Sequence, residues 1–230
     1  MSALQAIVFD FDGVIANSEP LHLVAFQQAL AEEGVELSAA DYYTRYLGYD
    51  DVGMFQALAR DRGLPMTDRH VTALVTRKGT RLQAMLAAGS VLFPGAADFI
   101  RVAAEAVPIA IASGALRHEI DEIIEAAGLA SLFTVVVASG DTPASKPSPA
   151  PYLLAFERLR QLTGRDIQGR RCVAIEDSRW GLESARGAGL RCVGVTNSYP
   201  GHELLEAELV VSGLDALTLD DLEQLCTAGA

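Results

Sequence analysis

Two carboxylates stand one residue apart where an apolar run ends near the start of the chain. In the segment IVFDFDGVIANSEP (7–20), Asp10 and Asp12 close the run and Gly13 follows. In extended backbone, residues two apart point to the same side, so both carboxylates would face one way. An Asp-Gly pair is also a common turn, but that interpretation does not explain the second acid inside the apolar run.

A second pair of acids ends another apolar run. Glu176 and Asp177 follow the letters CVAI, and Asp177 or Ser178 could also cap a helix that begins near Arg179. Capping does not exclude metal binding. Four carboxylates brought together would repel one another, and a divalent cation removes that repulsion. Because all the donors are oxygens, the pattern favours Mg²⁺, which commonly shares its ligands with a substrate phosphate.

Two further segments carry groups that could bind an anion. Lys146 lies in SKPSPAPY, where Pro147 and Pro149 favour extended backbone. A single lysine is usually solvated, but beside an acidic cluster its ammonium could neutralise the first carboxylate and a phosphate oxygen. Ser113 and Gly114 offer a hydroxyl and backbone N–H groups at the start of a helix, although Ser-Gly is also a common loop pair.

These groups stand at the ends of short apolar runs that alternate with helical patterns. The runs are rich in Val and Ile, as is typical of strands covered on both faces, and lie at 4–11, 107–113, 132–139, 171–177, 191–197 and, more weakly, 207–213. The helical patterns lie at 116–127, 150–163, 180–188 and 217–226. The alternation predicts an α/β fold with a doubly wound parallel sheet, in which ligands bind beyond the carboxyl ends of the strands.

One segment breaks this alternation. Residues 18–90 contain no convincing strand, and their patterns predict helices at 20–34, 39–47, 51–63 and 67–88. We therefore expect a helical domain inserted after the first strand. The predicted organisation is a catalytic core formed by residues 1–16 and 91–230, and a helical domain formed by residues 17–90.

Composition limits the classes of partner. The chain has 230 residues, half of them hydrophobic, and 30 acidic against 18 basic residues give a net charge of −12. This balance argues against nucleic acid and against an anionic membrane surface, and an anionic substrate would need a local positive centre. The three scattered cysteines, the lack of a signal-peptide pattern and the lack of a long apolar stretch lead us to expect a cytoplasmic protein. The oligomeric state is not readable from the sequence.

Four short motifs, in order, resemble those of the haloacid dehalogenase superfamily. They are DFDGV, ASG, KPSP and IEDSRWGLESARGAG, and they stand at the ends of the predicted strands. The chain looks most like the branch of phosphatases and β-phosphoglucomutases, which have an α-helical (type C1) cap. The resemblance covers essentially the whole chain and implies a Rossmannoid core with residues 17–90 as the cap.

The resemblance also implies catalytic roles. Asp10 would be the nucleophile that forms an aspartyl-phosphate, and Asp12 the general acid and base. Ser113, with Gly114 beside it, would bind the phosphoryl group, and Lys146 would bridge that group to Asp10. A proton on Asp12 near neutral pH agrees with the carboxylates and the desolvation expected around it.

The implied metal ligands come from both acidic pairs. Mg²⁺ would be bound by the Asp10 side chain, the Asp12 backbone carbonyl and Asp177. Glu176 would be a further ligand or would contact a ligand. Mg²⁺ and a lysine together cancel the repulsion between a carboxylate nucleophile and a phosphate.

Individual positions separate the sub-branches. Dehalogenases of the superfamily lack the second acid of the first motif and phosphonate-cleaving members have Ala there, so Asp12 favours phosphate esters. Mutases of the β-phosphoglucomutase type hold a second phosphate with a cap Arg shortly after a Gly, whereas here Gly48 is followed by Asp51, which would repel a phosphate. His22 and Lys78 keep mutase-like positions and are candidate substrate-binding residues, although each could be an ordinary polar side chain.

The sequence therefore predicts a Mg²⁺-dependent phosphatase. Its substrate would be a small phosphorylated metabolite, a sugar or polyol phosphate, hydrolysed through an aspartyl-phosphate. The alternative is a hexose-phosphate mutase of the β-phosphoglucomutase type. A non-catalytic module that binds phosphorylated metabolites is less favoured, because no acid of the motifs is missing.

Overall fold

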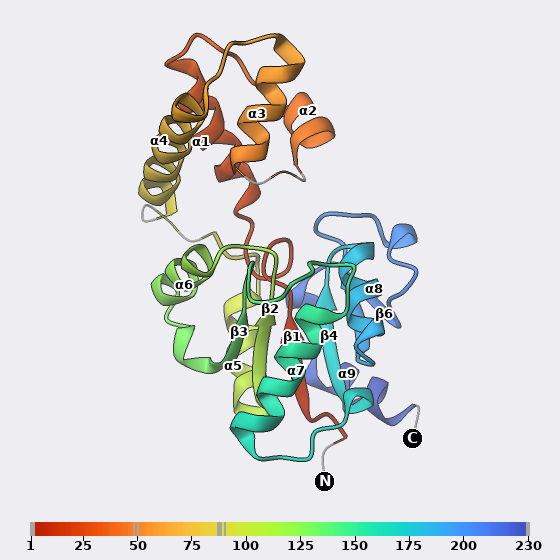
Figure 1. The fold of residues 1–230 in the computed structure, drawn as a ribbon. Helices are drawn as coiled ribbons and strands as arrows, with labels where there is room; N and C mark the ends of the chain where they lie inside the picture. The colour runs from red at the N-terminus through yellow and green to blue at the C-terminus, as the bar shows by residue number, and fades with distance from the viewer. Residues whose placement is uncertain (1–2, 48, 50, 87–88, 90, 229–230) are drawn as a thin grey trace. The chain divides into compact units, whose positions relative to one another are not determined.

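The chain forms two compact units (Figure 1). A computed structural model describes residues 3–47, 49, 51–86, 89 and 91–228. The core unit comprises residues 1–17 and 91–230, and the helical unit comprises residues 18–90. Asn17 lies in the core unit, and its backbone N–H donates to the carbonyl of Val91, 2.7 Å away.

The core unit is built on a six-stranded parallel sheet. Its strands are β1 (Ala6–Phe9), β2 (Ile109–Ala112), β3 (Phe133–Val137), β4 (Cys172–Glu176), β5 (Arg191–Val195) and β6 (Leu209–Val211). They lie in the order β3-β2-β1-β4-β5-β6. The predicted α/β fold with a doubly wound parallel sheet is confirmed, and each strand lies within a predicted apolar run.

The strand order places β1 and β4 side by side at the point where the winding reverses. From β1 the chain moves outward through β2 and β3, then returns to the other side of β1 for β4. The register pairs Phe9 with Ile175, and the N–H of Asp10 donates to the carbonyl of Ile175 at 2.9 Å. The ends of the two strands are thereby fixed together, and a crevice beyond such a reversal is where ligands bind in open α/β sheets.

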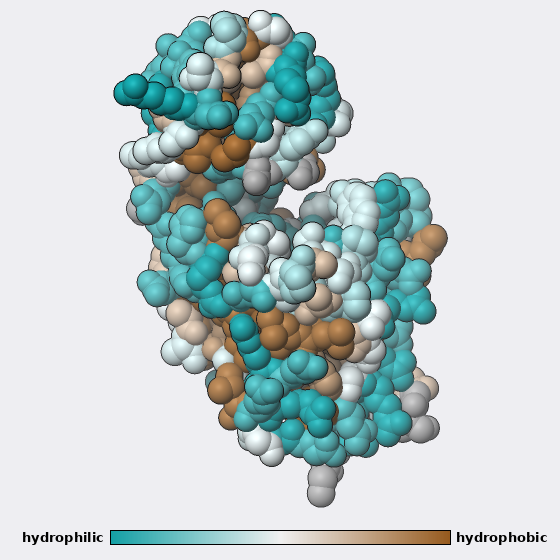
Figure 2. Space-filling view, viewed as in Figure 1, coloured by the Kyte–Doolittle hydropathy of each residue, from teal (hydrophilic) through white to brown (hydrophobic). Residues whose placement is uncertain are grey.

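Helices flank the sheet and bury its apolar strands. They are α5 (Ala96–Ala106), α6 (Arg117–Ala126), α7 (Ala150–Thr163), α8 (Arg179–Gly187) and α9 (Leu219–Thr227), with short 3-10 turns η2 (Ala130–Leu132), η3 (Gly169–Arg171), η4 (Gly201–Glu203) and η5 (Leu214–Ala216). Every residue of β1, β2 and β4 is buried. Figure 2 shows apolar residues on the viewed face of the core unit near α7, and α7 exposes Leu153 and Leu162.

One core helix, α5, has no counterpart in the sequence prediction. It begins after Gly95, which has a positive φ of 73° and offers no capping side chain. Strong N-terminal signals are Ser, Thr, Asp or Asn, so the start of this helix is poorly marked. The other four core helices match their predicted ranges to within two residues at each end.

The helical unit consists of α1 (Glu19–Ala31), α2 (Ala39–Asp41), the π-helix η1 (Tyr42–Tyr46), α3 (Asp51–Arg62) and α4 (Asp68–Leu86). The single helix predicted over 39–47 is thus a short α-helical turn that continues as a π-helix. A compact cluster that includes Phe26, Leu30, Phe55 and Leu58 forms the interior. Across the described parts of both units, none of the helices is sufficiently long and apolar to cross a membrane.

Candidate active site

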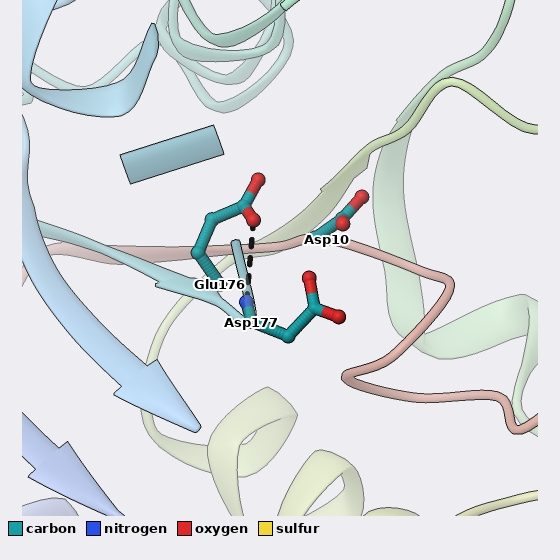
Figure 3. A group of neighbouring side chains, drawn as sticks. All are labelled: Asp10, Glu176 and Asp177. Carbon is teal, nitrogen blue, oxygen red and sulfur yellow. Dashed lines mark hydrogen bonds between the residues drawn. The ribbon is translucent and has the colours of Figure 1, made fainter. Parts of the chain in front are cut away.

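Three carboxylates meet at the carboxyl ends of β1 and β4. One carboxylate oxygen from each of Asp10, Glu176 and Asp177 lies within 4.8 Å of the other two, and Figure 3 shows the three side chains close together. The residues are 8%, 0% and 6% exposed. Such crowding of buried acids carries a large desolvation and repulsion cost, so compensating groups must lie beside them.

Lys146 supplies the first compensation. Its Nζ lies 2.7 Å from Asp10 Oδ1 and 2.6 Å from Glu176 Oε1. Although burial disfavours the charged amine, the two carboxylates raise the pKa of Lys146 above its ordinary value, so the side chain is an ammonium at neutral pH. The lysine that the sequence analysis places among the acids therefore forms ion pairs with two of them.

Glu176 is held by donors on both of its oxygens. Besides Lys146, the Tyr152 hydroxyl donates to Oε1 at 2.7 Å, and Oε2 accepts from the Asp177 N–H and the Ser178 hydroxyl, both at 3.2 Å. A Cβ at Gly181 would stand 1.9 Å from this carboxylate, so the α8 backbone closes over it. Whether Glu176 is a further metal ligand or contacts a ligand, the two roles that the sequence left open, stays a prediction, and its carboxylate is in either case held in place by these donors.

Asp177 is fixed from a different loop. The Ser198 hydroxyl donates to its carboxylate, and Asn197 Nδ2 donates to the carbonyl of Gly13 at 2.7 Å. The loop after β5 thus ties the Asp177 side to the turn after β1. Ser178 caps α8 by accepting from the N–H of Gly181 at 3.2 Å, which leaves the Asp177 carboxylate available for other partners.

Asp12 lies on the turn beyond β1. It is half-buried, and it forms an isolated bridge with Ala16. Among the residues that the structure describes, the three-carboxylate group contains Asp10 but not the side chain of Asp12. The sequence analysis proposed only the backbone carbonyl of Asp12 as a metal ligand, and its role as general acid and base stays a prediction.

Ser113 and Gly114 follow β2, the other neighbour of β1. Ser113 is 4% exposed, its N–H donates to Val137, and its Oγ accepts from the N–H of Ala115 at 3.0 Å. Because the hydroxyl oxygen accepts there, its proton remains to be donated elsewhere. Gly114 is exposed, and a Cβ there would meet no atom within 4 Å. This strand end therefore offers a hydroxyl and an open backbone.

The three acids and Lys146 together carry an excess of negative charge. Burial and the charge of Glu176 raise the pKa of Asp10 well above its ordinary value, while Lys146 opposes that rise. Burial and Glu176 raise the pKa of Asp177 to about 7. Three carboxylates against one ammonium leave uncompensated negative charge in a buried set of oxygen donors. This donor set fits a hard divalent cation such as Mg²⁺.

The two candidate residues of the helical unit lie together in its interior. Lys78 is fully buried, with its Nζ 2.8 Å from Asp51 Oδ1, 3.0 Å from His22 Nδ1 and 4.8 Å from the centre of the Phe26 ring. Burial and the Lys78 charge lower the pKa of His22 to about 3, so its imidazole is neutral. Asp51 thus forms an ion pair with Lys78, which removes much of the repulsion that the sequence analysis attributed to it. Gly48 lies outside the described residues.

Several site residues escaped the sequence analysis. Tyr152 looks like an ordinary core residue of α7, and Asn197 and Ser198 look like an ordinary loop. The position of Asn197 and Ser198 could have indicated them, because the loop after β5 leaves the same edge of the sheet as the loops that carry the acids.

A family comparison agrees with this geometry. The model of the haloacid dehalogenase-like hydrolases matches residues 4–189. The chain belongs to this family. The predicted membership of the haloacid dehalogenase superfamily, in its branch of phosphatases and mutases, is confirmed, and so is the prediction of an enzyme.

Three relatives of this haloacid dehalogenase-like hydrolase are similar to it over nearly their full lengths. The chain is 32% identical to Protein CbbY of Rhodobacter capsulatus, over 96% of this chain and 99% of that protein. It is 27% identical to a phosphorylated carbohydrates phosphatase of Thermotoga maritima, over 90% and 93%. The crystal structure of a CbbY variant from Rhodobacter sphaeroides in complex with xylulose-(1,5)bisphosphate is 29% identical, covers 92% of this chain and 95% of that chain, and has a TM-score of 0.77.

The turn after β1 depends on a glycine, which gives a first prediction. Gly13 has a φ of 80°, and a Cβ there would stand 1.8 Å from Asp177 Oδ2. We expect Gly13→Ala to lower the free energy of unfolding by about 1–2 kcal/mol for the positive φ and by about 1–3 kcal/mol more for the overlap. Urea unfolding measures both contributions.

Gly128→Ala is the matched control for this change. Gly128 has a φ of 66°, but a Cβ there would meet no atom within 4 Å, so only the conformational cost applies. Equal losses of stability in the two variants would contradict the packing of Gly13 against Asp177.

The raised pKa values give a prediction that couples pH to the metal. A carboxyl whose pKa is higher in the folded than in the unfolded chain stabilises the fold below its ordinary pKa, and this contribution disappears as the pH rises through the folded value. For Asp177 that upper limit is about 7. We expect Mg²⁺ to replace the lost protons, and therefore to raise the melting temperature by several degrees at pH 8 but far less at pH 5.5.

Thermal unfolding of chelator-treated protein, with and without MgCl₂ at both pH values, measures this difference. Asp177→Asn is the control and should remove most of the Mg²⁺ effect at pH 8. Equal Mg²⁺ shifts at the two pH values would argue against a cation site at these carboxylates.

Proposed function

We propose that this chain is a Mg²⁺-dependent phosphatase that hydrolyses a small phosphorylated metabolite through an aspartyl-phosphate. The observation that carries the proposal is the buried Asp10 carboxylate, paired with Lys146 and placed beside a second acid where the winding of the sheet reverses. A nucleophile needs such a setting if it is to attack a phosphate that is itself negative. The Lys146 ammonium reduces the repulsion between the Asp10 carboxylate and the substrate phosphate.

In the first step, an oxygen of Asp10 attacks phosphorus. The bond between phosphorus and the ester oxygen breaks, and the leaving alkoxide takes a proton from Asp12. This requires Asp12 to hold a proton at the start, and its place on the turn two residues after Asp10 keeps it within one loop of the reacting centre. Lys146 contacts both Asp10 and the transferring phosphoryl oxygens as negative charge spreads over them.

In the second step, water attacks the aspartyl-phosphate. Asp12, now a carboxylate, takes a proton from that water, and the bond between phosphorus and Asp10 breaks to release inorganic phosphate. Dividing the reaction into two displacements gives each step a positioned attacking group. Both active-site acids end in their starting protonation states.

The proposed metal ligands are Asp10, Asp177 and the backbone carbonyl of Asp12. Bound there, Mg²⁺ would supply positive charge to the phosphoryl oxygens. Glu176 has donors on both oxygens, so we assign it to positioning Lys146. Ser113 donates its free hydroxyl proton, and Gly114 its N–H, to the phosphoryl group at the end of β2.

We propose a sugar or polyol phosphate as the substrate. The names of two relatives support this class, because one is a phosphatase of phosphorylated carbohydrates and another was crystallised with a sugar bisphosphate. Within the helical unit, His22 and Lys78 are the proposed substrate-binding residues. Since Asp51 and His22 already contact the Lys78 ammonium, we expect the three side chains to act on substrate as one network.

The nucleophile is tested by Asp10→Asn. The amide keeps the shape of the side chain but cannot form the acyl-phosphate, so we expect phosphate release to fall by at least about 10³-fold. The melting temperature should change little, because Lys146 keeps its ion pair with Glu176. Wild-type turnover by this variant, measured with the same phosphate assay, would refute the assignment.

The type of reaction is tested with a panel of phosphorylated metabolites and Mg²⁺. We expect release of inorganic phosphate from one or more sugar or polyol phosphates, and loss of that release when the metal is chelated. Incubation with β-glucose 1-phosphate and a glucose bisphosphate activator tests the alternative of a mutase. Formation of glucose 6-phosphate without free phosphate would show a mutase instead.

A further inference from the structure

A cationic and aromatic cluster, which the mechanism above does not use, lies beside the acids. Arg179 and Trp180 open α8, directly after Asp177 and Ser178. The guanidinium carbon of Arg179 is 4.4 Å from the centre of the Trp180 ring. The Trp180 ring in turn makes a T-shaped contact with Tyr199, at 6.1 Å between ring centres. Three side chains, two from the start of α8 and one from the loop after β5, thus form one cluster, the Arg179 cluster.

The Arg179 cluster is close to Asp177. Tyr199 follows Ser198, whose hydroxyl donates to the Asp177 carboxylate. Burial raises the pKa of Tyr199, the charge of Asp177 raises it further and the charge of Arg179 lowers it, so both groups lie within electrostatic reach of the phenol. The guanidinium therefore stands at the edge of the proposed active site, within the same unit.

Among the described residues, Arg179 has no carboxylate partner, in contrast to an arginine at the equivalent place in another helix. Arg117 is the first residue of α6, and Asp141 and Asp121 lie 3.3 Å and 4.0 Å from its guanidinium. Arg179 is the first residue of α8, where the helix dipole also disfavours a cation. Over the part of the chain that the structure describes, no carboxylate oxygen lies within 4.0 Å of the Arg179 nitrogens. The side chain is exposed and can receive an anion from solution.

We propose that Arg179, supported by the Trp180 ring, binds a second anionic group of the substrate, a phosphate or a carboxylate, while the first phosphate is at Asp10. This inference rests on the proposed function and narrows its substrate class to phosphate esters that carry another negative group. A guanidinium held on an aromatic face loses little freedom on binding and offers paired N–H donors to such an anion. In a chain of net charge −12, a second anion needs a local positive group of this kind.

Kinetics on matched substrates test the proposal. Two pairs isolate the second anion: fructose 1-phosphate against fructose 1,6-bisphosphate, and glycerol 3-phosphate against 3-phosphoglycerate. In each pair only the second compound carries another anionic group, and we expect the wild type to favour that compound in one or both pairs. Arg179→Gln should raise the KM for that compound by about 10-fold to 100-fold and leave its kcat within about twofold. For the paired compound without the second anionic group, KM should also change less than about twofold.

Three further variants separate binding from a structural effect. Arg179→Lys keeps the positive charge but not the paired N–H donors of the guanidinium, so it should retain part of the affinity that Arg179→Gln loses. Trp180→Leu removes the supporting ring and should raise KM for the same substrate by a smaller factor. Arg170→Gln is the matched control, because Arg170 is exposed, has no described ion-pair partner and precedes β4 at the opposite edge of the sheet.

The outcomes are distinct from those that test the function itself. A tenfold or larger rise in KM in Arg179→Gln that is confined to substrates with a second anionic group supports the inference. If Arg179→Gln and Arg170→Gln release phosphate with the same kinetic constants, the inference is overturned, whereas the proposed phosphatase activity is not. Absence of phosphate release from every ester of the panel with wild-type protein would refute the proposed function and, with it, this subsite.

Discussion

The buried ammonium of Lys146 between Asp10 and Glu176 is the interaction on which the candidate site depends. Without it, three buried carboxylates would lie within 4.8 Å of one another with no positive charge between them, and they would tend to bind protons. Glu176 is bonded on both oxygens, so it fixes the ammonium in space. Buried ion pairs in general contribute little to stability, so we infer that the ion pairs of Lys146 serve to position the side chains at this site.

The sheet topology brings these groups together although they are far apart in sequence. Asp10 and Glu176 are separated by most of the chain, yet their strands are neighbours and the backbone bond from Asp10 to Ile175 fixes their register. The loops after β2 and β5 leave the same edge and add Ser113 and Asn197.

Much of this arrangement could be predicted from the sequence, because continuous apolar runs mark buried parallel strands and the acids stand at their ends. The winding rule then gathers Asp10, Asp177 and Lys146 at one edge without knowledge of side-chain packing. What the sequence could not supply was pairwise packing. Nothing in the letters shows that Tyr152 donates to Glu176, or that Asp51 neutralises Lys78 inside the helical unit. Helix α5 was missed because its first residue has no capping neighbour.

The glycines around the acids have a consequence for engineering this enzyme. At Gly181, as at the glycine of the first turn, a single added carbon would overlap a carboxylate. Gly114 has open space on the same rim. In a combinatorial library of variants, many side chains would therefore be tolerated at Gly114 and almost none at Gly181. Positions with open space, such as Gly114, are where a new substrate specificity could be introduced without loss of the fold.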